Sequence, residues 1–283
     1  MLNGDLKLDL PLMKGLALMS IVILISLYVD NYVYLVFTLI GGIGALIANS
    51  TGVGGGVVFV PVFSALNLEV EEIIGTSLMI QSFGMTFGAY HWMKRIKHEF
   101  NGNINEISKI VVVVFSGSIL GMLIIGQSIN NSFGSSLVIF KIVSIIFLVL
   151  LIINIVLKNN LFNVERHDGI RMLILMFFIG IVGGSMTLSV SIGIGELVAI
   201  ILIMTGYNVY LSISAAVILS SLTVIPSAIF YVNNNYVLWN VVLFAVPGAL
   251  IGARFSSSFA YYFGPVRIKY LIAAWVGLTV IFM

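Results

Sequence analysis

Two glycine-rich stretches interrupt apolar sequence and offer the clearest chemistry in this chain, GVGGG at 52–56 and GIGE at 193–196. Glycine inside a helix costs about 1 kcal/mol relative to alanine, so a helix is expected to end at each stretch and another to begin. The start of the new helix has free backbone N–H groups and the positive end of the helix dipole, an arrangement that attracts anions. We therefore predict a polar site for a small anion, contributed by Asn49, Ser50, Thr51, Gly52, Gly54, Gly55, Gly56, Gln81, Ser189, Ser191, Gly193 and Gly195.

Glu196 is a carboxylate well inside an apolar segment, whereas the other acidic residues lie in loops or near expected helix ends. Ionisable side chains inside a membrane are costly and usually functional. Two roles fit this position: a carboxylate that caps the helix N-terminus, or a partly protonated group that couples proton movement to transport. Because a permanent negative charge would repel a bound anion, the second role favours a Glu196 that carries a proton.

Other side chains that could do chemistry are few. Lys141 lies in the apolar segment FGSSLVIFKIVSIIFLVLL, where it either extends to the outer surface or faces a cavity and attracts an anion. His91 and Trp92 are expected in an interfacial belt. The chain has no cysteine, no HExxH, no phosphate-binding GxxxxGK[ST] and no pair of buried aspartates. We therefore predict that it is not an enzyme and holds neither a metal nor a cofactor.

The elements that position these residues follow from the composition. The 283 residues are 60% hydrophobic and 8% charged, and the mean hydropathy is +1.16. Because a soluble domain is about 25% charged, we predict an all-α polytopic membrane protein. Apolar segments lie near 14–29, 31–50, 55–67, 73–93, 108–127, 135–157, 170–190, 196–206, 209–232, 237–253 and 265–283. The segments at 55–67 and 196–206 are too short to span, and their helices should begin at Gly55–Gly56 and at Glu196.

The chain reads as two copies of one unit. GGIGALIANSTGVGGG at 41–56 aligns with VGGSMTLSVSIGIGE at 182–196, which pairs Gly52 with Gly193 and, further along, Tyr90 with Tyr231. Loops rich in Lys and Arg are cytoplasmic, and this rule gives the copies opposite orientations, a cytoplasmic N-terminus and an external C-terminus. Inverted repeats whose glycine-broken half-helices meet near the bilayer midplane are typical of secondary transporters. The predicted units are an interfacial segment with a first helix over 1–30, repeat 1 over 31–157, a cytoplasmic linker over 158–169 and repeat 2 over 170–283.

Several of these stretches also carry a family resemblance. They are GGIGALIANSTGVGGG, the proline in VVFVP, the following EEIIGTSLMIQSF, and in the second copy GIGE with VPGALIGARF and FGPVRIKYL behind it. With these features the chain resembles the TauE/SafE sulfite exporter family of membrane permeases, from about residue 35 to the C-terminus. The resemblance implies a carrier of sulfite, a sulfonate or a related sulfur-containing organic acid. The second copy departs from the pattern because Glu196 stands where a third glycine would be expected.

Two kinds of function stay open. The first is a secondary transporter in the cell membrane that moves a small anion by alternating access, with proton coupling through Glu196. The alternative is an anion channel or uniporter with the same broken-helix site. The expected partners are the anionic solute and the lipid bilayer, and nucleic acid is not expected. Small-residue motifs such as GSILG at 117–121 and GALIG at 248–252 are predicted to pack helices, and they permit a homodimer.

Overall fold

The structure is a computed structural model that describes residues 34–66, 68–99, 104–126, short pieces between 138 and 153, and 169–282. All regular structure in these residues is helical, which confirms the all-α prediction. Four of the described helices are long and apolar enough to cross a membrane, over Ile107–Gly126, Ile170–Val190, Val209–Asn233 and Trp239–Gly264. The predicted first helix, the linker over 158–168 and most of 135–157 lie outside the described residues.

Eight helices are described, and the shortest two follow the two glycine stretches. In chain order they are α2 (Leu35–Thr51), α3 (Gly56–Ser64), α4 (Val70–Glu99), α5 (Ile104–Gly126), α7 (Ile170–Val190), α8 (Ile194–Met204), α9 (Val209–Asn233) and α10 (Trp239–Phe282). The long helix α10 bends sharply at Gly264, whose φ of 78° lies outside the helical range. The segments predicted at 237–253 and 265–283 are therefore the two arms of one bent element.

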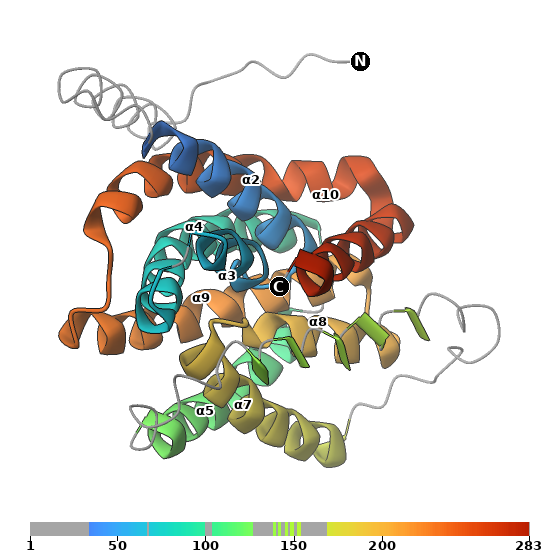
Figure 1. The fold of residues 1–283 in the computed structure, drawn as a ribbon. Helices are drawn as coiled ribbons and strands as arrows, with labels where there is room; N and C mark the ends of the chain where they lie inside the picture. The colour runs from blue at the N-terminus through green and yellow to red at the C-terminus, as the bar shows by residue number, and fades with distance from the viewer. Residues whose placement is uncertain are drawn as a thin grey trace.

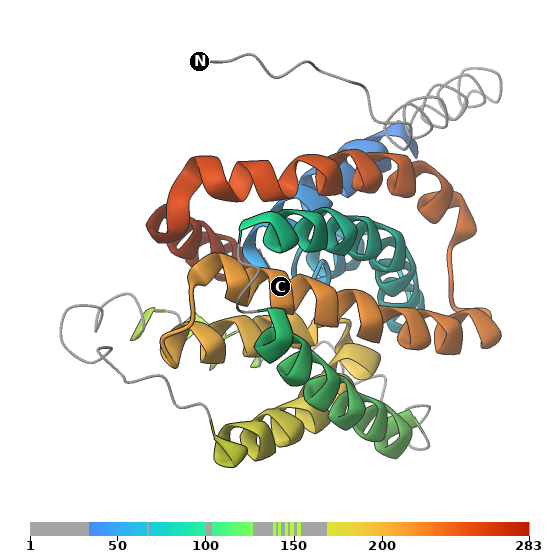
Figure 2. The ribbon, with the colours of Figure 1, turned by 180° about the vertical axis from the view of Figure 1, so that it is seen from behind.

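The helices form two outer pairs with a central group between them (Figures 1 and 2). α2 packs along α10 on one side and α5 packs along α7 on the other, while α4 and α9 contact each other in the centre together with α3 and α8. Both outer pairs use the predicted small-residue motifs. A Cβ on Gly248 would collide with the backbone of Thr38 in α2, and one on Gly121 would collide with the backbone of Ile181 in α7. The packing role predicted for these motifs is confirmed.

α4 differs from the four spanning candidates because polar residues interrupt its apolar sequence. Thr76, Ser77 and Gln81 lie on its inner face and are buried. This helix is 30 residues long, yet it is not among the four spanning candidates. Some of its polar residues therefore face the centre of the molecule, while Thr86 is exposed on another face.

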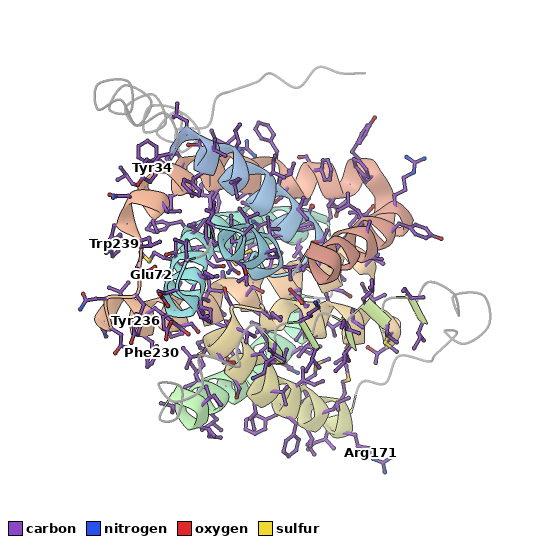
Figure 3. All side chains as sticks on the ribbon, viewed as in Figure 1. Tyr34, Glu72, Arg171, Phe230, Tyr236 and Trp239 are labelled. Carbon is purple, nitrogen blue, oxygen red and sulfur yellow. The ribbon has the colours of Figure 1, made fainter. Side chains whose placement is uncertain are left out.

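The two ends of the central helices differ in charge. Glu72, at the start of α4, lies at the same end as Tyr236 and Trp239, whereas Arg171 lies at the far end (Figure 3). The backbone N–H of Leu238 donates to the Thr76 hydroxyl at 3.0 Å, which fixes the α9–α10 loop beside the start of α4. Near the other end of α4, His91 Nδ1 lies 3.5 Å from Arg254 of α10. The first turn of α4 is therefore acidic, with Glu71 and Glu72, whereas its other end is mainly basic and includes one ion pair, between Arg95 and Glu99.

Candidate functional site

The first glycine stretch separates α2 from α3. α2 ends at Thr51, and Gly52 turns the chain with a φ of 78° while its N–H donates to the Ala48 carbonyl. This left-handed conformation is strained for any residue with a Cβ, which accounts for glycine here. α3 then begins at Gly56 with Gly55 as its N-cap, as the sequence predicts.

The second stretch separates α7 from α8 by an equivalent turn. Ser191 takes the left-handed conformation with a φ of 60°, and its N–H donates to the Thr187 carbonyl. α8 begins at Ile194 with Gly193 as its N-cap. The predicted start at Glu196 is therefore wrong by two residues. The reason is that a serine, not a glycine, makes the turn, which leaves Gly193 free to begin the helix and places Glu196 in its first turn.

The two breaks touch each other. An ideal Cβ on Gly54 would lie 2.6 Å from the Gly193 Cα, and one on Gly193 would lie 2.8 Å from the Gly54 Cα. The contact continues on both sides, because the Ser191 carbonyl lies against Gly56 and the Gly52 carbonyl lies against Gly195. Backbone meets backbone here, so glycine is needed for the approach and not only for the turns.

A buried cluster of hydrogen-bonded side chains joins α4 to the second break. The Gln81 amide donates to the hydroxyls of Ser191, at 2.8 Å, and Ser77, at 3.0 Å. These two hydroxyls lie 3.0 Å apart and share a hydrogen bond. The Gln81 Oε1 has no partner among the described residues, and it lies 3.6 Å from the position of a Cβ on Gly54. Gln81 therefore bonds to one break and presents a free polar atom to the other.

Glu196 also links the two breaks. Its side chain is 2% exposed, and its carboxylate interacts with the backbone N–H of Gly54. The Oε1 atom has no hydrogen-bond partner in the described part of the chain. Of the two predicted roles, capping would use N–H groups of α8 itself, whereas this electrostatic interaction leads across to the first break. A buried carboxyl with an unpartnered oxygen is the kind of group that gains or loses a proton or a ligand.

Two aromatic side chains hold the helix ends beside the breaks. The last carbonyls of a helix lack partners within it, and the Trp92 indole N–H donates to the Asn49 carbonyl in the last turn of α2 at 2.7 Å. The Tyr231 hydroxyl donates in the same way to the Leu188 carbonyl in the last turn of α7 at 2.8 Å. Trp92 is fully buried, so its predicted place in an interfacial belt is wrong. Hydropathy could not reveal this, since an indole suits an interface and a core equally well.

The remaining predicted residues lie near the breaks and bond mainly within their own helices, although the Asn49 amide also donates to the Gly84 carbonyl of α4 at 3.4 Å. The Asn49 amide donates to the Ala45 carbonyl, the Ser50 and Thr51 hydroxyls donate to the Ile47 carbonyl, and the Ser189 hydroxyl donates to the Ser185 carbonyl. These groups satisfy backbone acceptors at the ends of α2 and α7. Lys141 is half-buried in a short described piece, and no contact joins it to the breaks within the described residues.

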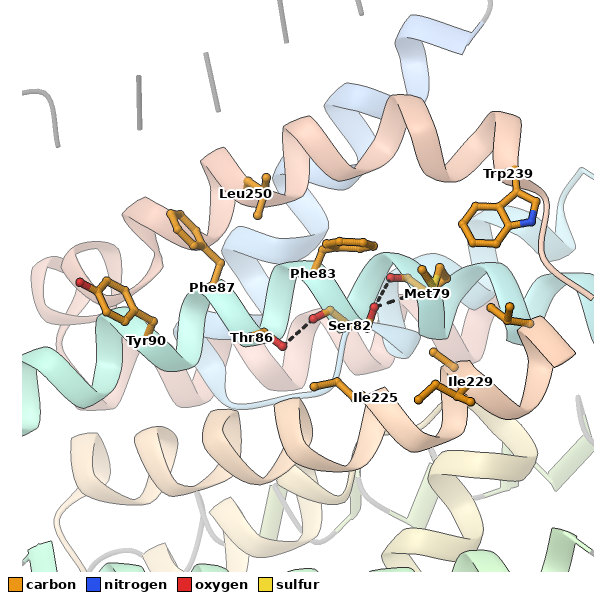
Figure 4. A pocket seen from close by; sticks show the side chains of 12 residues that line it. Met79, Ser82, Phe83, Thr86, Phe87, Tyr90, Ile225, Ile229, Trp239 and Leu250 are labelled. Carbon is orange, nitrogen blue, oxygen red and sulfur yellow. Dashed lines mark hydrogen bonds between the residues drawn. The ribbon is translucent and has the colours of Figure 1, made fainter. Parts of the chain in front are cut away.

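The space beside the breaks is small. Asn49 and Gln81 line a cavity of about 10 Å³ whose other walls are largely apolar, which is room for about one water molecule. The larger hollow, about 620 Å³, lies elsewhere, between α4, α9 and α10. Its walls are apolar and aromatic, and its hydroxyls from Ser82 and Thr86 already bond to backbone carbonyls (Figure 4). The polar chemistry is therefore at the closed breaks and not in the larger groove.

Comparison with known proteins gives one kind of match. The model of the family described as Sulfite exporter TauE/SafE matches residues 37–283, a range that includes both breaks. No curated protein and no solved structure matches the chain. The match begins within two residues of the start predicted from the glycine motif, and it confirms the resemblance.

Proposed function

Since the chain belongs to the TauE/SafE sulfite exporter family, whose members are membrane transporters, we propose that it is a secondary carrier of a small sulfur-containing anion. The solute would be sulfite, a sulfonate or a related organic acid, and it would cross the cell membrane by alternating access. The single observation that carries this proposal is the contact between two buried helix breaks, with Gln81, Ser191 and Glu196 around it. Helices interrupted inside a membrane protein need such polar partners and commonly build solute sites.

The two breaks support an inverted repeat, with repeat 1 over 31–157 and repeat 2 over 170–283. Equivalent contacts recur in each half: a left-handed turn at Gly52 and Ser191, and an aromatic bond to the preceding helix end from Trp92 and Tyr231. These contacts pair Gly52 with Ser191, and Trp92 with Tyr231. The sequence alignment pairs Gly52 with Gly193, so these contacts shift the pairing of the two repeats by two residues. In the new register Gly54 is equivalent to Gly193, the residue that it touches, as expected for residues beside a two-fold axis.

The charge distribution supports the proposed orientation. Glu72 and the α9–α10 loop lie at one end of α4, while Arg95 and Arg254 lie toward the other. Basic ends are retained in the cytoplasm, so the basic end of α4 would face the cytoplasm and the acidic end the exterior. With residues 1–30 as an interfacial segment and first helix and 158–169 as a cytoplasmic linker, the N-terminus would be cytoplasmic and the C-terminus external.

The anion would be held by the first-turn N–H groups of α3 and α8 together with the hydroxyl of Ser191 and the amide of Gln81. Gln81 can rotate its amide by half a turn, which keeps both serine contacts and presents N–H groups to the breaks. Glu196 would carry a proton while the anion is bound, because two negative charges so close together in a buried site repel strongly. The cavity of about 10 Å³ is too small for the solute, so binding requires the two repeats to move apart. This need for movement supports a carrier over an open channel.

The test is uptake and efflux of labelled anions in proteoliposomes, with and without a pH gradient. The panel contains sulfite, thiosulfate, sulfoacetate, taurine and simple carboxylates. Glu196→Gln removes the titrating group with little change of shape, and Glu69→Gln, at an exposed position before α4, is the matched control. We expect gradient-driven flux of a sulfur anion in the wild type and the control, and its loss in Glu196→Gln. Flux that ignores the gradient and survives Glu196→Gln would indicate a channel or uniporter instead.

A further inference from the structure

Among the serine and threonine hydroxyls of α9, the hydroxyl of Ser220 differs from the others in its hydrogen bonding. The five other serine and threonine hydroxyls in this helix each donate to a backbone carbonyl three or four residues earlier, as expected for buried hydroxyls in a helix; they belong to Ser212, Ser214, Ser221, Thr223 and Ser227. Ser220 is fully buried, yet its Oγ has no hydrogen-bond partner among the described residues. Leaving a buried hydroxyl unpaired costs free energy, so such a group calls for a reason.

The Ser220 hydroxyl points at the start of α8. Its Oγ lies 3.1 Å from the position of a Cβ on Gly193, the N-cap, and closer still to that of a Cβ on Gly195. The carbonyl of Ala216, which lies four residues before Ser220 and is the usual acceptor for such a hydroxyl, also lies against Gly195. The hydroxyl therefore faces the free N–H end of a helix and bonds to neither of the two carbonyls beside Gly195, those of Ala216 and Gly52. An anion at this helix end would supply it with an acceptor.

Gln81 occupies the matching position in the other half. It lies beside Gly54, just as Ser220 lies beside Gly193, and the register set by Gly52 with Ser191 pairs Gln81 with Ser220. Both side chains present an unpartnered polar atom to the Gly54–Gly193 contact. The two halves thus direct one polar group each, from equivalent places, to the point where the breaks meet.

We propose that Ser220 is an additional solute ligand, which donates its hydroxyl proton to an oxygen of the sulfur oxyanion held at the start of α8. This inference rests on the proposed transport function and adds to it a specific binding residue on α9. The shared chemistry is a negatively charged oxygen, as found in sulfite, in a sulfonate and in a carboxylate. Ser220 therefore contributes affinity for the oxyanion, while the opposite side chain, Gln81, differs in size and meets another part of the solute.

The experiment compares Ser220→Ala with Ser221→Ala in the full-length protein. Ser221 is the adjacent residue, and its hydroxyl is already bonded to the Ile218 carbonyl at 2.7 Å, so its loss controls for removing a helical hydroxyl. The KM and maximal rate of anion uptake are measured in proteoliposomes, and stabilisation of the detergent-solubilised protein by sulfite or sulfoacetate is measured by thermal unfolding. Ser220→Cys, which keeps the shape with a weaker donor, is the second variant.

For Ser220→Ala we expect a rise in KM of about tenfold, the effect of losing one hydrogen bond to a charged group. The maximal rate should stay within about twofold of the wild type, and the anion-induced thermal shift should shrink. The KM and thermal shift of Ser220→Cys should lie between those of the wild type and those of Ser220→Ala. A KM and thermal shift equal to those of Ser221→Ala would overturn this inference while leaving the transport function intact. Absence of both flux and thermal stabilisation in the wild type, for every anion tested, would overturn the transport function and this inference with it.

Discussion

The contact between Gly54 and Gly193 can be tested by adding one methyl group. In Gly54→Ala the new Cβ would lie 2.5 Å from the Gly193 nitrogen and 2.6 Å from its Cα. Ordinary contacts of a Cβ begin at 3.4 Å, so the two breaks must separate by about 0.9 Å, the difference between 2.5 Å for the nearest atom and 3.4 Å. The opposing atoms are backbone, and no side chain can rotate away to relieve the collision.

Overpacking of this kind costs about 1–3 kcal/mol. We expect Gly54→Ala to lower the melting temperature and to reduce solute flux by at least about tenfold, because 1.4 kcal/mol corresponds to a factor of ten in an equilibrium. The measurements are thermal unfolding in detergent and initial rates in proteoliposomes, normalised to the amount of inserted protein. The loss of flux should exceed what the loss of folded protein accounts for, because the methyl group lies where the solute would bind.

Gly126→Ala is the matched control for this change. Its Cβ would meet only the Leu188 side chain, at an ordinary 3.6 Å, so its flux and melting temperature should equal those of the wild type. If Gly54→Ala behaves like Gly126→Ala in both assays, the two breaks are not in contact and the reasoning fails. A lower melting temperature with normal flux would place the contact in folding and not in transport.

Two further changes test the neighbouring contacts. Ser191→Gly relieves a left-handed residue but removes the hydroxyl that bonds to Ser77 and Gln81, so the melting temperature should change little while flux falls; unchanged flux would exclude the hydroxyl from the site. Tyr231→Phe leaves the Leu188 carbonyl without its 2.8 Å donor, and unfolding should become easier by about 1–3 kcal/mol. An unchanged melting temperature in Tyr231→Phe would show that this carbonyl finds another partner.

Sequence patterns predicted the elements well where one residue type has one physical meaning. Glycine clusters in apolar sequence indicated both breaks: the first lies within GVGGG, and the second lies at 191–193 and ends at the first glycine of GIGE. The start of α8 was misplaced because a serine adopts the left-handed turn at 191, a conformation that composition does not announce. The two-residue shift in the proposed repeat has the same origin, since aligning glycine with glycine pairs Gly52 with Gly193 and passes over Ser191.

The partners of the buried polar groups could not be predicted from sequence. Glu196 was recognisable as an unusual carboxyl, but its interaction with the Gly54 N–H joins segments far apart in the chain. Ser220 is one of several serines in α9, and only geometry shows that its hydroxyl alone among them lacks an acceptor within the described residues. Trp92 likewise gives no signal of its role until the carbonyl that it caps is located. Hydropathy and spacing specify helices, whereas a site depends on which helix faces meet.

The unlike residues at equivalent positions argue for a solute site over a purely structural junction. If the breaks served only to let helices meet, glycine at 191 would make the turn without the strain of about 1–2 kcal/mol that a left-handed residue with a side chain bears. Glycine does make that turn at the equivalent position 52. The serine at 191 instead places its hydroxyl within 3.0 Å of both Gln81 and Ser77. The strained residue lies in a buried polar centre, and the other half uses glycine at the equivalent position. This strain is better explained by solute binding than by folding.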